Sequence, residues 1–354
     1  MTQDMTAFGL TERWAAAARE YPGLVPGRVV AQEKGLYRVV SERGEQAADI
    51  SGKLRYRVGS AVELPAVGDF VMMDGAPPGM AMIHHVLPRK SVFVRRAAGG
   101  LYQEQVVAAN IDTVFLCMSL NRDFDLRRLE RYLAVCWESG ALPVVVLTKA
   151  DLCGDPAEQL AAVRTAARGA EVRITAAREK DGYEQVLPYL KEGQTVALVG
   201  SSGVGKSTLL NALLGEDRLA TNGLRNDDRG RHTTTRRALF RLPRGGLVID
   251  TPGMREVGLW DADGGLDKTF DDIEALFGQC RFKNCGHTSE PGCAVLAAVD
   301  SGALSPERWR SYQKLRAENA YAGDAAGYLA AKERKRQDIA KTVRAKKADG
   351  SIRR

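Results

Sequence analysis

Hydrophobic positions follow two different patterns along the chain, and the pattern changes at about residue 98. From Val25 onward, short runs rich in β-branched and aromatic residues alternate with turn residues: GRVVAQE, LYRVVSE, QAADIS, KLRYRV, GDFVMMD, MAMIHHV and SVFVRR. Short strands at nearly regular spacing are typical of a small closed barrel. We therefore expect a short helix, LTERWAAAARE, followed by a barrel of about five strands.

The predicted barrel is of the OB-fold type, which often binds oligonucleotides. Its basic segments, Lys53–Arg57 and the arginines and lysine between Arg89 and Arg96, favour RNA as the partner. A small β domain without any RNA role is the alternative, and aromatic residues that could stack on bases are sparse in this region.

After about residue 106, longer apolar runs alternate with helical patterns. The runs IDTVFLCMSL, LPVVVLTKAD, EVRITAA, TVALVG and GLVIDTPG are expected strands, and DLRRLERYLAVCWESG, AEQLAAVRTAARG and KSTLLNALLG are expected helices. Continuous apolar strands between helices indicate a parallel sheet that is covered on both faces. Ligand sites in such sheets lie at the carboxyl ends of the strands.

The chain divides into three predicted domains: 1–98 with the N-terminal helix and barrel, 99–262 with the α/β domain, and 263–354 with a Cys/His cluster, helices and a basic tail. The tail 332–354 contains ten Lys or Arg and three acidic residues, so it carries the whole net charge of +7. This uneven distribution points to a polyanionic partner.

The remaining composition narrows the class of protein. No apolar run reaches the roughly 18 to 20 residues that span a bilayer, and the N-terminus has no basic start followed by an apolar segment. We therefore expect a cytoplasmic protein without a membrane partner.

The α/β region contains a glycine-rich loop between the predicted strand TVALVG and the predicted helix KSTLLNALLG. It fits G-x-x-x-x-G-K-[ST], in which backbone N–H groups point at phosphate oxygens and the helix N-terminus adds positive potential. The loop comprises Gly200, Ser201, Ser202, Gly203, Val204, Gly205, Lys206 and Ser207, and Thr208 follows in the nucleotide-binding set. We expect Lys206 to reach the β- and γ-phosphates and Ser207 to hold Mg²⁺.

Two further segments are predicted to face the same phosphates. At the end of the strand GLVID, the segment DTPG places Asp250 to contact Mg²⁺ through water and the N–H of Gly253 to sense the γ-phosphate. Between the loops lies NDDRGRHTTTRRALF, which we interpret as the first switch. One of Thr233, Thr234 and Thr235 should complete the Mg²⁺ coordination, and we favour Thr234.

Catalysis needs a group that orients the attacking water. The residue after DTPG is Met254, which cannot do so. His232, directly before the threonines, is therefore the candidate catalytic residue, and Glu256 is a weaker rival. Because no arginine finger can be assigned, although Arg229 and Arg231 lie in the switch, hydrolysis is expected to be slow without a partner.

A second nucleotide motif, [NT]-K-x-D, ends the strand LPVVVL. Its residues are Thr148, Lys149, Ala150 and Asp151. An aspartate can accept hydrogen bonds from guanine N1–H and the 2-amino group together, and adenine offers no such pair of donors. Asp151 therefore predicts a preference for GTP over ATP, and Lys149 is expected to pack along the base.

One strand later, Thr175 and Ala176 occupy the place where GTPases usually direct a backbone N–H at guanine O6. The guanine-reading motif thus ends at Asp151, and the phosphate loop begins 49 residues later at Gly200, the reverse of the usual order. Each motif still lies at the end of a predicted strand. A circular permutation explains this order, because the termini of compact domains are often close together.

The region after the α/β domain contains the pattern Cys280-x₄-Cys285-x-His287-x₅-Cys293. Three thiolates and one imidazole are the four ligands that a tetrahedral structural Zn²⁺ takes, and they leave no open position for a water molecule. We therefore expect one structural zinc ion, with Arg281 and Lys283 on the outside of the knuckle.

These features together closely resemble the ribosome small-subunit-dependent GTPase A family. The resemblance rests on the OB-like barrel, TKAD ahead of GSSGVGKST, then HTTT, DTPG and the Cys/His spacing. It implies an α/β fold: a circularly permuted P-loop GTPase domain with an N-terminal OB-fold barrel and a C-terminal zinc-binding helical domain. The chain departs from the family pattern at Thr175–Ala176, where a serine is more usual.

The resemblance also implies a function. It describes a bacterial GTPase that binds GTP and GDP, acts late in maturation of the 30S ribosomal subunit and binds 16S rRNA through both flanking domains. Hydrolysis would be stimulated by the small subunit and followed by release. The family pattern supports His232 as the catalytic histidine.

Two other functions fit some of the motifs: an RNA-binding scaffold whose nucleotide is structural, and an ATP-dependent enzyme with the same phosphate loop. We expect a monomer.

Overall fold

The computed structural model describes residues 3–33, 35–75, 79–96, 104–121, 123–215, 237–250 and 262–323. The chain forms two compact units, residues 1–258 and 259–354, which are described separately below. The sequence-based domain boundaries at residues 98 and 262 remain predictions.

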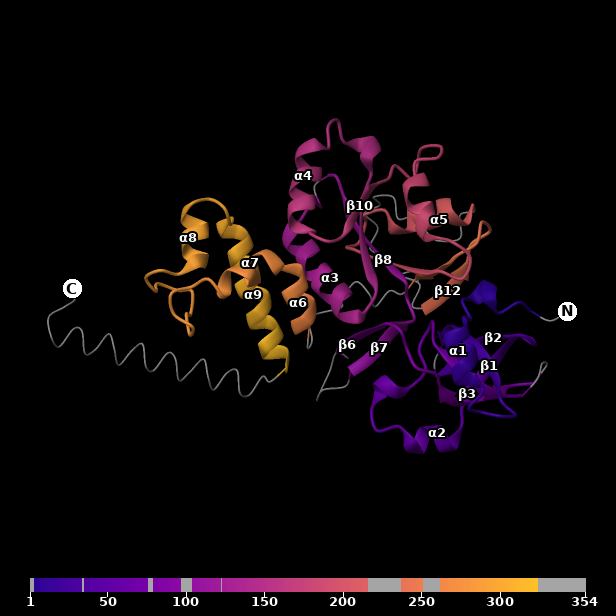
Figure 1. The fold of residues 1–354 in the computed structure, drawn as a ribbon. Coiled ribbons are helices and arrows are strands. Elements are labelled where there is room, and N and C mark those ends of the chain that lie inside the picture. The colour runs from indigo at the N-terminus through magenta and orange to yellow at the C-terminus, as the bar shows by residue number, and fades with distance from the viewer. Residues whose placement is uncertain are drawn as a thin grey trace, which may run out of the picture. The chain divides into compact units, whose positions relative to one another are not determined.

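The first unit begins with an OB-type barrel (Figure 1). After η1 (Thr6–Phe8) and α1 (Glu12–Ala18), its strands are β1 (Val25–Glu33), β2 (Leu36–Ser41), β3 (Gly44–Ile50), β4 (Phe70–Asp74) and β5 (Ala81–Val86). They pair in the order β1-β2-β3-β5-β4, and β1 pairs with β4 to close the barrel. Val29, Val39, Val71 and Ile83 are buried inside it because alternate strand residues face the same side.

The segment KLRYRV is a helix, so its prediction as a β-rich run is wrong. It forms α2 (Gly52–Arg57), which begins where the side chain of Ser51 accepts a hydrogen bond from the Leu54 N–H at 3.2 Å. Leu54 is the buried residue of this helix, whereas Tyr56, which a strand would place on the same face, is exposed. The helix is followed by η2 (Ala61–Glu63).

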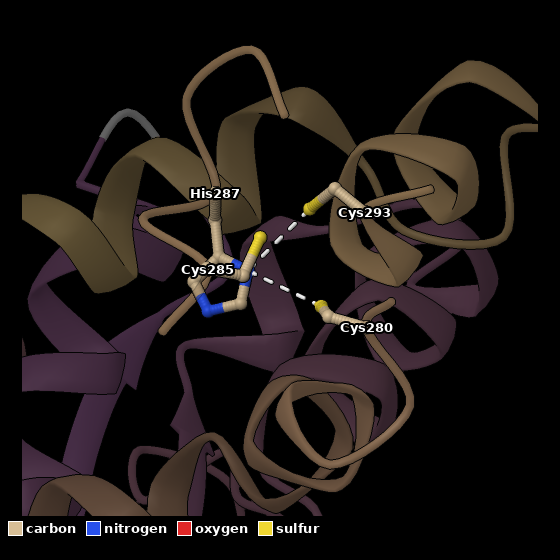
Figure 2. Close-up of side chains that lie close together, drawn as sticks. All are labelled: Cys280, Cys285, His287 and Cys293. Atoms are coloured by element: carbon tan, nitrogen blue, oxygen red, sulfur yellow. Dashed lines mark hydrogen bonds between the residues drawn. The ribbon is translucent and has the colours of Figure 1, made fainter. Parts of the chain in front are cut away.

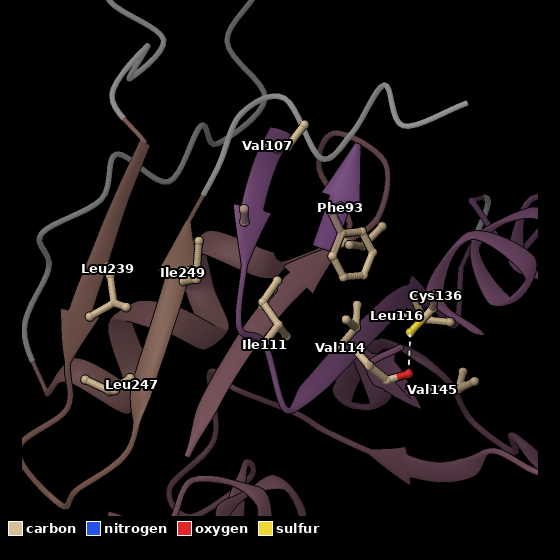
Figure 3. Packing of buried hydrophobic residues seen from close by; sticks show 14 of the residues in the cluster. Phe93, Val107, Ile111, Val114, Leu116, Cys136, Val145, Leu239, Leu247 and Ile249 are labelled. Atoms are coloured by element: carbon tan, nitrogen blue, oxygen red, sulfur yellow. Dashed lines mark hydrogen bonds between the residues drawn. The ribbon is translucent and has the colours of Figure 1, made fainter. Parts of the chain in front are cut away.

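The predicted run SVFVRR also lies outside the barrel. It becomes β6 (Val92–Arg96) and pairs with β7 (Glu104–Ala109) as a separate antiparallel sheet. Phe93 of β6 and Val107 of β7 contribute to the large core on one face of the α/β sheet (Figure 3).

The α/β part of the sheet has the order β10-β9-β8-β11-β13-β12. Its strands are β8 (Thr113–Ser119), β9 (Leu142–Thr148), β10 (Glu171–Ile174), β11 (Thr195–Val199), β12 (Arg237–Arg241) and β13 (Leu247–Asp250). All neighbouring pairs are parallel except β12 with β13. The carboxyl ends of the parallel strands therefore meet at one edge, where the predicted nucleotide motifs lie.

Helices cover both faces of this sheet, as the continuous apolar strands predict. They are α3 (Leu126–Ser139), η3 (Ala150–Leu152), α4 (Ala157–Ala166), η4 (Glu184–Tyr189) and α5 (Lys206–Leu214). Val114 and Leu116 of β8 share one core with Cys136 of α3 (Figure 3). Phe115 of the same strand faces the opposite core with Leu210 of α5.

The barrel and the α/β sheet are one continuous sheet in this unit. Strand β1 pairs with β12 through Ala31 opposite Ala238 and Gln32 opposite Arg237. Arg28 of the same strand is buried, and its guanidinium donates to the carbonyl of Phe8 at 2.5 Å and to the hydroxyl of Thr195 at 2.9 Å. Because Thr195 begins β11, this side chain joins the barrel to the strand that leads into the phosphate loop.

In the second unit, the described residues form α6 (Asp263–Thr269), α7 (Asp271–Phe277), α8 (Ala294–Asp300) and α9 (Pro306–Gly323). Arg308 of α9 is nearly buried and donates two 2.8 Å hydrogen bonds to Asp272 of α7. Arg316, two turns later, forms ion pairs with Asp263 at 2.8 Å and Glu274 at 2.7 Å. These pairs attach α9 to α6 and α7.

Candidate functional site

The phosphate loop joins β11 to α5 and requires its first glycine. Gly200 has φ of +151°, and a Cβ placed there would lie 2.4 Å from the carbonyl oxygen of Cys117 in the neighbouring strand β8. A side chain at this position would therefore push the loop away from the sheet. Ser202 and Gly203 at the tip of the loop are exposed, as a site for an incoming phosphate requires.

The guanine-reading motif is in direct contact with this loop. The hydroxyl of Thr148 donates a hydrogen bond to the carbonyl oxygen of Val204, and a Cβ on Gly205 would lie 3.6 Å from the Thr148 side chain. Thr148 ends β9, which is separated from β11 by β8 alone. The fold thus brings the two motifs to one edge of the sheet although the guanine-reading motif precedes the loop in the chain.

The rest of the guanine-reading motif forms a tight turn. Lys149 has φ of 60°, the left-handed region, and the N–H of Ala150 donates to the carbonyl of Thr175 at 3.2 Å. This bond holds the motif against the loop after β10. Asp151 is exposed at the end of the turn, so its carboxylate is accessible to a base.

Thr175 and Ala176 are both buried beside that turn. The N–H of Thr175 donates to Leu147 at 2.8 Å, and the N–H of Ala176 donates to Gly182 at 2.7 Å. Both backbone donors therefore have protein partners in this conformation. A contact between this loop and guanine O6, which the sequence predicts, would require the Ala176–Gly182 bond to open or a later N–H to make the contact.

Lys206 and Ser207 begin α5, whose N-terminus faces the loop. The ammonium group of Lys206 donates to the carbonyl oxygen of Gly200 at 2.6 Å and also to that of Ser201. The lysine thus lies across the loop and covers its carbonyl groups. A bound triphosphate would offer it stronger, charged acceptors than these carbonyls.

One carboxylate beside the phosphate loop, that of Asp123, belongs to none of the predicted sequence motifs. Asp123 lies between β8 and α3, where it accepts a hydrogen bond from the Ser201 hydroxyl and another from Arg128 at 2.8 Å. Partial burial would raise the pKa of Asp123, but the hydrogen bonds from Arg128 and Ser201 outweigh it and lower that pKa. The available signal was its place in NRDFD, directly after a predicted strand at the ligand-binding edge.

Asp250 ends β13, next to β11, so it lies at the same edge as the loop. The other predicted phosphate-side residues fall outside the described part of the chain: His232, Thr233, Thr234, Thr235 and Gly253. Their assignments remain predictions.

The second site is the Cys/His cluster between α7 and α8. Cys280, Cys285, His287 and Cys293 each place one potential ligand atom within 4.8 Å of the others (Figure 2). The Nδ1 atom of His287 lies 3.6 Å from the sulfur of Cys280 and 3.4 Å from that of Cys293. Ligands of one tetrahedral ion lie at such separations from one another, so the donor set fits a single metal ion.

Neighbouring groups hold the cluster in place. The ring of His287 stacks on Phe277 of α7 with centroids 4.3 Å apart, which fixes the direction of its Nδ1 atom. Glu290 accepts hydrogen bonds from the N–H groups of Gly286, Thr288 and Ser289 at 2.9, 2.8 and 3.0 Å. These bonds lower the pKa of Glu290 to about 2, so it stays ionised while it shapes the knuckle.

Solved structures with the same arrangement define the class. The crystal structure of YjeQ from Thermotoga maritima aligns with a TM-score of 0.62 and 27% identity, over 82% of this chain and 97% of that one. YloQ, a circularly permuted GTPase, aligns with a TM-score of 0.59 and 23% identity, over 83% of this chain and 94% of that one. The fold is therefore that of a circularly permuted P-loop GTPase, as predicted.

The family follows from sequence. Residues 86–260 match the model of the RsgA GTPase family. Small ribosomal subunit biogenesis GTPase RsgA 2 of Lactiplantibacillus plantarum is 49% identical over 91% of both chains, and the RsgA of Opitutus terrae is 46% identical over 90% of both. The chain belongs to the RsgA family of GTPases, which confirms the resemblance and the enzyme class predicted from sequence.

Among the residues that the structure describes, no helix is long and apolar enough to cross a membrane.

Proposed function

We propose that this chain is a GTP hydrolase that acts in late maturation of the 30S ribosomal subunit. Its relatives are named small ribosomal subunit biogenesis GTPases, and they match it over nearly the whole chain. The observation that carries the proposal is the hydrogen bond from Thr148 to Val204, because it joins a guanine-reading motif to a phosphate loop. One nucleotide would then contact both motifs.

The nucleotide would be GTP before hydrolysis and GDP after it. Asp151 would accept from the guanine N1–H and 2-amino groups, and Lys149 would pack along the base. Backbone N–H groups of the phosphate loop would surround the phosphates, with Lys206 on the β- and γ-phosphates. The proposed GTP-binding set is Thr148, Lys149, Ala150, Asp151, Thr175, Ala176, residues 200–208, Asp250 and Gly253.

Mg²⁺ bound with GTP would neutralise charge on the β- and γ-phosphate oxygens. The hydroxyl groups of Ser207 and Thr234 would hold the ion, and Asp250 would contact it through water. His232 would orient the attacking water, since Met254 cannot. The cluster of three cysteines and His287 would hold one structural Zn²⁺.

The partners would be the 30S subunit and its 16S rRNA, contacted by the barrel and by the second unit. The subunit would stimulate hydrolysis, and the change from GTP to GDP would lower the affinity and release the protein. We expect a monomer in the cytoplasm, where ribosomes mature.

Single-turnover hydrolysis of GTP with and without purified 30S subunits tests the proposal. We expect strong stimulation by the subunit, which falls steeply as salt rises because phosphate contacts release counterions. His232→Ala should abolish the stimulated rate and leave GTP affinity intact. Stimulated turnover that is unchanged in this variant would exclude His232 as the catalytic residue.

The same experiment separates the alternative of an RNA-binding scaffold with a structural nucleotide. A scaffold would bind 30S subunits with GTP or GDP equally well and would show no stimulated hydrolysis. The scaffold would be favoured over the GTP hydrolase by two results together. The protein would bind 30S subunits equally tightly with GDP and with a non-hydrolysable GTP analogue, and the subunits would not raise the rate of GTP hydrolysis.

A further inference from the structure

The segment between β8 and α3 lies beside the phosphate loop. Because β8 ends at Ser119 and α3 begins at Leu126, Asp123 lies between them and outside any helix or strand. Its carboxylate accepts a hydrogen bond from the hydroxyl of Ser201, which is 78 positions away in the phosphate loop. No ladder of backbone hydrogen bonds fixes Asp123, so the position of the loop at Ser201 depends on what holds this carboxylate.

Arg128 of α3 holds the carboxylate from the other side. Its guanidinium donates to Oδ1 of Asp123 at 2.8 Å, whereas the Ser201 hydroxyl donates to Oδ2. Arg128 also forms a longer ion pair with Asp125 at 3.4 Å. One carboxylate therefore bridges two donors, of which one belongs to α3 and the other to the phosphate loop.

The start of α3 directs Arg128 towards this segment. Asp125 is the N-cap residue, and its side chain accepts hydrogen bonds from the N–H groups of Arg127 at 2.9 Å and Arg128 at 3.1 Å. Side chains on a helix lean towards its N-terminus. Arg128 lies in the first turn, so its side chain points back at the residues before the helix, where Asp123 lies.

The charge of Asp123 fixes the direction of the hydrogen bond to the loop. Partial burial acts to raise the pKa of Asp123, but the hydrogen bonds from Arg128 and Ser201 and the charges of Arg128 and Lys149 lower it overall. The carboxylate is therefore ionised at pH 7, and an ionised carboxylate only accepts hydrogen bonds. The hydroxyl hydrogen of Ser201 is thus directed at Asp123.

Packing alone does not fix the carboxylate. A cavity lined by Asp123, Arg128, Tyr132 and Ser201 lies beside the pair. The side chains of Arg128 and Asp123 are 36% and 35% exposed, and ion pairs with this exposure contribute little to the stability of a fold. We therefore expect the pair to affect the phosphate loop more than the stability of the unit.

We propose that Arg128 is a positioning residue for the phosphate loop, which acts through Asp123 on Ser201 and thereby raises the affinity for GTP and GDP alike. This inference rests on the proposed function in that Ser201 belongs to the proposed GTP-binding set. It adds a residue of α3, outside every nucleotide motif, that sets the nucleotide affinity.

Titration of the full-length protein with fluorescent GDP and a fluorescent GTP analogue tests the proposal. Arg128→Met should weaken both by the same factor, about threefold, because the carboxylate loses a charge-assisted hydrogen bond at a partly exposed site. Arg128→Lys should retain most of the affinity, since an ammonium group can still donate to Asp123. Arg164→Met, at an exposed arginine of α4, is the matched control and should change neither affinity.

A double-mutant cycle tests the route through Ser201. In a Ser201→Ala background, Arg128→Met should cause little further loss of nucleotide affinity, because the bond through which the arginine acts is already absent. A further threefold loss in that background would overturn the proposal, since Arg128 would then act by another route. Unchanged affinity in Arg128→Met alone would also overturn it.

Steady-state hydrolysis separates positioning from a merely structural role. An interaction that is equally strong in the ground state and the transition state changes KM and leaves kcat unaltered. Arg128→Met should therefore raise the KM for GTP about threefold at the wild-type kcat. A lower kcat and a lower thermal transition at unchanged KM would mean that Arg128 only stabilises the fold, and the positioning role would be wrong.

These outcomes are distinguishable from failure of the proposed function, because the nucleotide titration needs no ribosomal subunit. If 30S subunits stimulate the wild type and Arg128→Met binds nucleotides like the wild type, the positioning role is wrong and the function stands. If Arg128→Met weakens nucleotide binding as expected but 30S subunits do not stimulate the wild type, the positioning role stands and the proposed function is wrong. A wild type that binds neither nucleotide contradicts both.

Discussion

At the scale of single residues, the nucleotide site depends on where a few side chains are aimed. Asp151 is exposed at the end of a turn that the Ala150–Thr175 bond holds in place. Its role is a matter of hydrogen-bond matching with the base, so a change of one atom in the side chain tests it.

Asp151→Asn should weaken GTP binding by about 10- to 100-fold, because a charge-assisted pair of hydrogen bonds is lost. The same variant should gain affinity for xanthosine triphosphate, whose N1–H and 2-oxygen match the acceptor and donor of an asparagine. Competition binding with GTP, xanthosine triphosphate and ATP measures both changes. Asp155→Asn, an exposed carboxylate four residues later, is the control; unaltered nucleotide choice in Asp151→Asn would favour the ATP-dependent alternative.

Asp123 and Ser201 provide a second residue-scale prediction. Because their hydrogen bond links the phosphate loop to the segment between β8 and α3, Asp123→Ala and Ser201→Ala should each weaken the binding of GDP and of a GTP analogue by the same factor, about threefold to tenfold. The double variant should be little worse than either single variant, with a coupling of about 1 kcal/mol. Titration with fluorescent nucleotides measures all four proteins, and strictly additive losses would show that the two side chains act separately. Glu45→Ala on the barrel is the control.

At the scale of elements, sequence patterns identified the strands and helices that have strong periodicity. They failed where a single side chain determines whether a segment is a helix or a strand. The apolar strands that end in TKAD, GSSGVGKST and DTPG were found because their motifs and their periodicity agree. KLRYRV alternates like a strand, yet the Ser51 cap and the lone buried Leu54 make it a helix. Asp123 was missed because its loop carries no motif, and its partner Ser201 lies 78 residues away.

Arg28 on β1 gives the element-scale prediction. Burial lowers its pKa to about 10, while Asp112 and Asp69 act in the opposite direction, so it is charged at pH 7. Besides Phe8 and Thr195, it donates to Gly68 and Asn110 at 3.2 and 3.3 Å. Arg28→Met should lower the free energy of unfolding by about 3 kcal/mol or more, since buried acceptors lose their donor.

Urea unfolding followed by circular dichroism measures this loss. Arg28→Lys should also be destabilised, because one ammonium group cannot reach the acceptors that the planar fork serves. Arg38→Met, on the exposed side of the barrel, is the control and should change stability by less than about 0.5 kcal/mol. Equal stability of Arg28→Met and the wild type would show that the buried cation does not hold the barrel to β11.

At the scale of the whole molecule, the sequence predicted the order of the elements better than the contacts that hold distant elements together. The permuted order could be inferred because each nucleotide motif keeps its strand, whatever the position of the chain ends. The pairing of β1 with β12 joins residues about 200 positions apart and leaves no local pattern, so it could not be predicted. The ion pairs of Arg308 and Arg316 that hold the second unit are invisible for the same reason.

The metal cluster yields a prediction for the second unit. The purified protein should contain about one zinc ion per chain, and a strong chelator should make residues 262–323 sensitive to protease while the first unit keeps its thermal transition. Cys293→Ser should have the same effect without a chelator. Cys153→Ser, a thiol outside the cluster, is the control. Protection of the second unit in metal-free protein would show that its helices hold the knuckle without an ion.

Strand β12 lies between β1 of the barrel and β13, and it contains residues 237–240, the last part of the segment that we interpret as the first switch. A ligand on the barrel and a nucleotide at the loop would therefore act on opposite sides of one strand, which is hydrogen-bonded to β1 on one edge and to β13 on the other. Thermodynamic linkage then imposes a symmetry: if RNA on the barrel raises the affinity for GTP by some factor, GTP must raise the affinity for RNA by that same factor. Both quantities can be measured independently, so the connection through β12 can be tested in both directions.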